Sequence, residues 1–146
     1  MVRVALGTLA LAPTMTASNL TKPSKLQFWT GAVLSALPML FMTMSGVMKL
    51  AHPPMVVEGF AKSGMTLTDV TVIGVIELLC VVIYLLPKTA ILGAVLVVGY
   101  LGGAIMVHVR AHEVQFIAPL VLGMCAWGGL YLREPRLREL LPLRKR

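Results

Sequence analysis

The sequence predicts an all-α protein in which four helices cross a membrane as one bundle. Of its 146 residues, 58% are hydrophobic and 13% are charged, about half the charged share of a soluble domain. A soluble chain of this length has too much surface for its volume to hide so many apolar side chains. The apolar residues also gather in four runs, each near the roughly 20 residues that a helix needs to cross a bilayer.

The four runs cover residues 29–48, 70–86, 89–109 and 116–132. Each is expected to be helical, because lipid offers no hydrogen-bond partner to an exposed backbone amide. Only Pro87 and Lys88 separate the second run from the third, and a similarly short segment follows the third. These short connections predict antiparallel neighbours, and we expect the glycines of the third run (Gly99, Gly102 and Gly103) to pack it closely within the bundle.

A longer segment joins the first run to the second. Its apolar residues between Met55 and Phe60, interrupted by Glu58, predict a short helix that lies on the membrane surface. Thr68 or Asp69 is expected to cap the second span, since both residue types favour that position.

The chain divides into three parts. Residues 1–24 form an N-terminal extension that we expect to be disordered, residues 25–133 form the membrane domain, and residues 134–146 form a basic cytoplasmic tail. Ten Lys and Arg residues fall on the side of the termini and three on the other side, so the positive-inside rule predicts both termini in the cytoplasm. The net charge of +7 does not indicate nucleic-acid binding, because it is concentrated in the tail and lacks interleaved aromatic residues.

Three ionisable residues are expected at neighbouring depths near the outer ends of the spans. Glu77 lies about eight residues inside the second run, or about 12 Å along a helix, and an intramembrane carboxylate usually has a partner or a function. Lys49 and His108 end the first and third runs. Helical side chains lean toward the helix N-terminus. Lys49 and His108, on spans that run outward, therefore lean into the membrane, and Glu77, on a span that runs inward, leans out toward them. Glu77 and His108 are therefore candidate proton-exchanging groups, and Lys49 is a candidate ligand contact.

Three further residues extend this candidate site. Cys80 and Tyr84 share the helix face of Glu77, and Gln115 opens the fourth run. Alternative interpretations remain open: Glu77 can serve only to hold helices together, Lys49 can simply reach toward water, and Cys80 can be a small buried hydrophobic residue. No metal is predicted, because the histidine spacing matches no known ligand pattern.

Four segments in order resemble the DoxX-like family across about residues 25–133. They are FWTGAVLSALPMLFMTMSGVMKL, HPPMVVEGFAKSGM, GVIELL and GYLGGAIMVHVR. The resemblance implies a four-helix protein of the bacterial inner membrane that is associated with oxidoreductase systems, including a thiosulfate:quinone oxidoreductase. It therefore implies a quinone or another small amphipathic ligand, and possible membrane partner subunits. No CxxC pair is present, which excludes a thioredoxin-like dithiol. A small-solute carrier and a structural or assembly subunit are the alternative functions.

Overall fold

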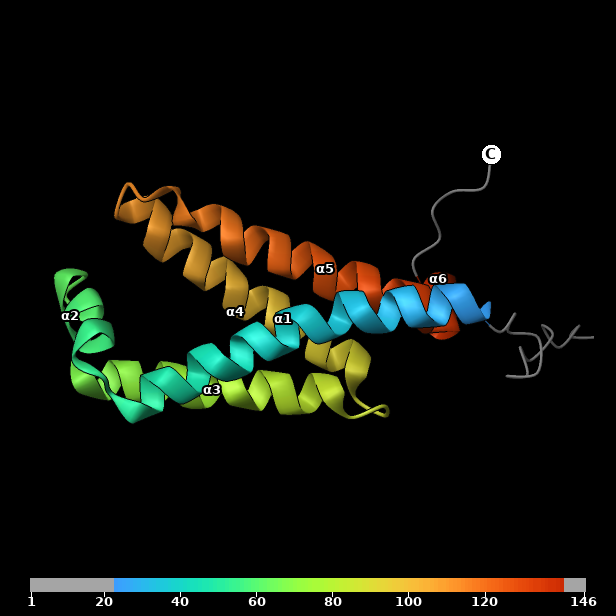
Figure 1. Ribbon diagram of the computed structural model, residues 1–146, viewed down its shortest axis with the longest axis horizontal. Coiled ribbons are helices and arrows are strands. Elements are labelled where there is room, and N and C mark those ends of the chain that lie inside the picture. The colour runs from blue at the N-terminus through green and yellow to red at the C-terminus, as the bar shows by residue number, and fades with distance from the viewer. Residues whose placement is uncertain (1–22, 141–146) are drawn as a thin grey trace, which may run out of the picture.

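The computed structural model describes residues 23–140 of the chain, and its regular structure there is helical (Figure 1). Four long helices confirm the four predicted spans, and each is long and apolar enough to cross a membrane. The predicted N-terminal extension lies outside the described residues as far as residue 22, and so does the basic tail after residue 140. In order, the elements are α1 (Lys25–Ala51), α2 (Pro54–Lys62), α3 (Leu67–Leu85), α4 (Ala90–Arg110), the short helix η2 (Val114–Phe116), α5 (Ile117–Arg133) and α6 (Pro135–Leu140).

The start of α3 differs from the prediction. Its N-cap is Thr66, whose hydroxyl accepts a hydrogen bond from the Asp69 backbone amide. The Asp69 carboxylate in turn accepts one from the Thr66 amide at 2.7 Å. The prediction that Thr68 or Asp69 is the N-cap is therefore wrong, because the reciprocal hydrogen bonds of a capping box make Thr66 the N-cap and Asp69 the third residue of the helix.

The four spans form a ring in which α1 packs on α3, α3 on α4, α4 on α5, and α5 back on α1. At the end of the bundle that carries α2, the α1–α3 pair and the α4–α5 pair separate from each other (Figure 1). The opposite end, which carries α6, stays closed. We refer to these as the α2 end and the α6 end.

Glycines set the close approaches between the helices. A Cβ added at Gly129 would lie 2.7 Å from the Gly31 carbonyl oxygen, where α5 meets α1, and one at Gly74 would lie 3.2 Å from the Gly46 carbonyl oxygen, where α3 meets α1. Gly93 of α4 packs against the backbone of Tyr84 in α3. No side chain can occupy such contacts, which lets the backbones touch.

The expectation that Gly99, Gly102 and Gly103 pack the bundle is wrong. Nothing among the described residues lies within 4 Å of a Cβ built on any of them, and all three are exposed. The reason is geometric: α3 and α4 meet near the α6 end and diverge toward the α2 end (Figure 1). Small residues therefore leave an opening at this level of α4 instead of a contact.

The α6 end is sealed by a buried polar contact. The Tyr84 hydroxyl donates to the Ala126 carbonyl oxygen at 2.7 Å and lies 2.9 Å from Ser35 Oγ, so it links α3 to α5 and α1. The Arg133 guanidinium lies 5.4 Å from the centre of the Tyr84 ring. Leu137 of α6 also packs into the hydrophobic core.

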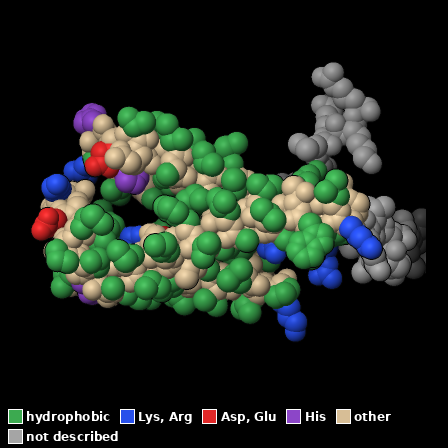
Figure 2. Space-filling model, viewed as in Figure 1, with side chains coloured by type: hydrophobic (Ala, Val, Ile, Leu, Met, Phe, Trp, Pro, Cys, Tyr) green, Lys and Arg blue, Asp and Glu red, His purple; other side chains and the backbone are tan. Residues whose placement is uncertain are grey.

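On the face of the bundle that Figure 2 shows, hydrophobic side chains cover the long side, and most charged ones lie toward the two ends. Exposed residues on the sides include Leu40 of α1, Leu79 of α3 and Val95 of α4. Such a surface suits contact with the hydrocarbon of a lipid bilayer, which is consistent with a multi-pass membrane protein.

Replacing Gly93 by alanine should destabilise the bundle by about 1–3 kcal/mol, because the new methyl group would overlap backbone atoms of α3. Gly102→Ala on the same helix is the matched control, since its methyl group would meet open space. Thermal unfolding of the purified protein in detergent measures both. Equal unfolding midpoints for the two variants would contradict the close α3–α4 contact.

Candidate functional site

A buried ion pair joins α1 to α3 at the α2 end. Lys49 Nζ lies 2.7 Å from Glu77 Oε2, and the two residues are only 9% and 3% exposed. The backbones come close enough because Gly46 and Gly74 form the helix contact beside the pair. The structure therefore brings together two of the ionisable residues that the sequence singles out.

Ser45 completes this network. It lies one turn before Lys49 on α1 and accepts a hydrogen bond from Nζ at 2.5 Å. Its own hydroxyl donates to Glu77 Oε2 at 3.3 Å. The three side chains thus supply one another's hydrogen-bond partners. A buried charge without a partner at this position would destabilise the protein.

The helix α2 covers the ion pair from the side of the connecting segment. The ring of Phe60 lies with its centre 5.9 Å from Lys49 Nζ, within the range of a cation–π contact. Residues 52 and 53 turn the chain between α1 and α2, with His52 in the left-handed conformation at the end of α1. This segment therefore folds back over the polar network instead of leaving it exposed.

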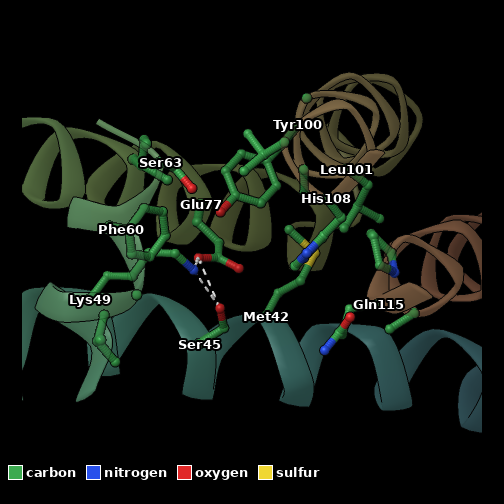
Figure 3. Close-up of a pocket in the computed structure, with 18 of the residues that line it drawn as sticks. Met42, Ser45, Lys49, Phe60, Ser63, Glu77, Tyr100, Leu101, His108 and Gln115 are labelled. Atoms are coloured by element: carbon green, nitrogen blue, oxygen red, sulfur yellow. Dashed lines mark hydrogen bonds and ion pairs between the residues drawn. The ribbon is translucent and has the colours of Figure 1, made fainter. Parts of the chain in front are cut away.

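Tyr100 of α4 faces the same carboxylate from across the bundle, with its hydroxyl directed at Glu77 (Figure 3). Sequence reasoning missed this residue. One signal was present: between Ala90 and Val107, Tyr100 is the only residue whose side chain can form a conventional hydrogen bond. It also lies about two helical turns before His108.

These residues line a cavity of about 770 Å³ between the diverging helix pairs. Apolar side chains, including Met42, Leu101 and Leu122, form much of its wall, and the volume is in the range of small-molecule sites. Phe41 of α1 and Gly99 and Gly103 of α4 are exposed and also line it, so the cavity reaches the side of the bundle. The polar lining includes Ser45, Lys49, Glu77, Tyr100, His108 and Gln115.

The other predicted site residues divide into two groups. His108 and Gln115 line the cavity, but the Nδ1 atom of His108 lies 2.7 Å from Glu113 Oε2, so its direct partner is this loop carboxylate rather than Glu77. Cys80 and Tyr84 lie in the hydrophobic core instead. Tyr84 shares the helix face of Glu77 but sits about two turns deeper, where the bundle is closed.

Within residues 23–140, no group of three His, Cys, Asp or Glu side chains is arranged to hold a metal ion. The chemistry of the cavity thus lies in a paired carboxylate, a neighbouring phenol and an imidazole nearer its mouth. This arrangement can hydrogen-bond a polar group and exchange protons with it.

Four apolar spans around a buried Lys–Glu pair define a multi-pass integral membrane protein. The model of the DoxX-like family matches residues 33–129, and the chain belongs to this family. The matched segment includes the ion pair, Tyr100, His108 and Gln115. No curated protein and no solved structure matches the sequence.

Removing one member of the ion pair should destabilise the protein more than removing both. Lys49→Met leaves a buried carboxylate without its cation, which is expected to lower the free energy of unfolding by about 3–5 kcal/mol. The double variant Lys49→Met/Glu77→Leu leaves no unpaired charge and should recover most of that loss. Lys62→Met, at an exposed lysine of α2, is the control. A double variant as unstable as Lys49→Met would contradict this energetic interpretation.

Proposed function

We propose that this DoxX-like protein is the membrane component of a redox or small-molecule-handling system, and that its cavity binds a small amphipathic molecule such as a quinone. The observation that carries this proposal is the buried Lys49–Glu77 pair at the wall of a largely apolar cavity. A polar head group would meet Glu77 and Tyr100, while apolar parts would lie along the remaining wall.

The proposed roles follow from the contacts. Glu77 and Tyr100 hydrogen-bond the polar end of the ligand, and Lys49 neutralises the carboxylate and holds it in place through Oε2. His108, paired with Glu113, relays protons between the cavity and the water at its mouth. The exposed lining residues Phe41, Gly99 and Gly103 favour entry of the ligand from the bilayer, because they lie well below the end of the bundle.

Electron transfer would require the ligand itself or a partner subunit, since the sequence has no CxxC dithiol. The α6 end argues against the carrier alternative, because within residues 23–140 Tyr84 and other core residues fill the bundle there and are not among the residues that line the cavity. The experiments below measure ligand binding and stability on the same variants. They therefore distinguish a ligand-binding protein from an assembly subunit, whose polar residues would only stabilise the bundle.

We further propose that the protein lies in a bacterial inner membrane with both termini in the cytoplasm, the α2 end facing outward and α2 on the membrane surface. The excess of Lys and Arg on the side of the termini supports this orientation. The amphipathic character of α2, with Glu58 and Lys62 exposed among apolar residues, supports its interfacial position.

Cysteine labelling in spheroplasts tests this orientation. In a background with Cys80 and Cys125 replaced by alanine, a cysteine introduced by Ser63→Cys at the α2 end should react with a membrane-impermeant maleimide. One introduced by Lys88→Cys, in the α3–α4 turn, should react only after the membrane is permeabilised. The reverse pattern would place the α2 end in the cytoplasm, and the cysteine-free background measures nonspecific labelling.

Ligand binding tests the site. Purified wild-type protein in nanodiscs should bind a short-tailed benzoquinone or its hydroquinone. Glu77→Gln should weaken binding of the hydroquinone about tenfold or more, because it removes the charged group that accepts the ring hydroxyl's hydrogen bond. Glu58→Gln changes an exposed carboxylate of α2 and should bind like wild type. Thermal unfolding of each variant identifies any loss that comes from misfolding. Unchanged affinity in a folded Glu77→Gln variant would overturn the role of Glu77.

A further inference from the structure

The two oxygens of the Glu77 carboxylate have different surroundings. Lys49 and Ser45 both bind Oε2, at 2.7 Å and 3.3 Å. Oε1 is bound by neither of them. Glu77 lines the cavity, and the Tyr100 hydroxyl is directed at its carboxylate (Figure 3). A carboxylate that is 3% exposed therefore presents one oxygen to the network that holds it and the other to whatever enters the cavity.

The Lys49 ammonium group, the cation of this site, already has partners within the protein. Lys49 Nζ donates to Glu77 and Ser45, and its remaining side faces the ring of Phe60. A negatively charged head group would find no free cation there and would meet the charge on Oε1. The contacts thus disfavour carboxylate or phosphate ligands despite the buried lysine.

The Tyr100 hydroxyl supplies the second polar contact. A ring hydroxyl placed between Glu77 and Tyr100 can donate to Oε1 and accept from the Tyr100 hydroxyl. A carbonyl or an ether oxygen can only accept, so it would leave Oε1 facing a lone pair. A hydroxyl donating to an ionised carboxylate forms one of the stronger hydrogen bonds in proteins.

We propose that the cavity selects neutral molecules that carry a ring hydroxyl, of the phenol or hydroquinone class, over the corresponding carbonyl, ether and carboxylate compounds. This inference rests on the proposed function and specifies which form of the ligand the site holds: the reduced, hydroxyl-bearing one. Met42, Phe60 and Leu101 provide the apolar surroundings for the ring.

Three compounds with the same tail test the selection without redox chemistry: para-decylphenol, its methyl ether and para-decylbenzoate. Because the tails are identical, differences in affinity report mainly on the head group, after each compound's partition into empty nanodiscs has been subtracted. We expect the phenol to bind at least about tenfold more tightly than the ether, and the benzoate to bind most weakly.

Tyr100→Phe should weaken binding of the phenol and of the ether alike, because the Tyr100 hydroxyl can donate to either oxygen, and it should leave the unfolding midpoint close to that of wild type. Glu77→Gln should instead remove most of the preference for phenol over ether, because it removes the ionised acceptor that only the phenol can use. Tyr131→Phe is the matched control, because Tyr131 lies near the α6 end beneath Arg138. Equal binding of phenol and ether by the wild type, or a preference for benzoate, would overturn this inference alone. If none of the three compounds binds, and neither quinone nor hydroquinone binds, the proposed function itself fails.

Discussion

One interaction constrains how α1 and α3 pack: the ion pair between Lys49 and Glu77 at membrane depth. Neither charge is tolerable alone in a low-dielectric environment, so α1 and α3 must bring them within contact distance. The glycine contact between Gly46 and Gly74 makes that approach possible. Ser45 then bonds both partners, and the other oxygen of the carboxylate, Oε1, is bound by neither Lys49 nor Ser45.

The cavity follows from where the helices do and do not touch. Contacts at Gly31, Gly93 and Gly129 close the bundle toward the α6 end, whereas Gly99 and Gly103 lie where α4 has moved away from α3. The α1–α3 pair and the α4–α5 pair are held together toward the α6 end and diverge at the α2 end (Figure 1). The polar network therefore sits at the level where the bundle opens, and the segment containing α2 covers it.

The sequence alone predicts the four spans and the approach of Lys49 to Glu77, because apolar run length and side-chain direction along a helix are local properties. It does not predict which glycines make contacts, since that depends on the crossing of two helices: Gly93 packs tightly, and Gly99 of the same helix faces open space. The partner of His108 was missed for a similar reason. Glu113 lies five residues away, in a loop whose conformation cannot be predicted from the spacing of apolar residues. Its carboxylate, and not that of Glu77, is the direct partner of His108.

A comparison of the two buried polar networks supports a functional rather than a purely structural role for the ion pair. Tyr84 is completely buried, and its hydroxyl is fully used in linking three helices, as expected of a group that only fixes packing. Glu77 also links helices, yet it lines a cavity as well. A buried ion pair is a weak source of stability, because apolar residues of similar volume often serve as well. If holding α1 against α3 were the sole requirement, a second contact of the Tyr84 kind would suffice, without a charge and without an adjoining cavity.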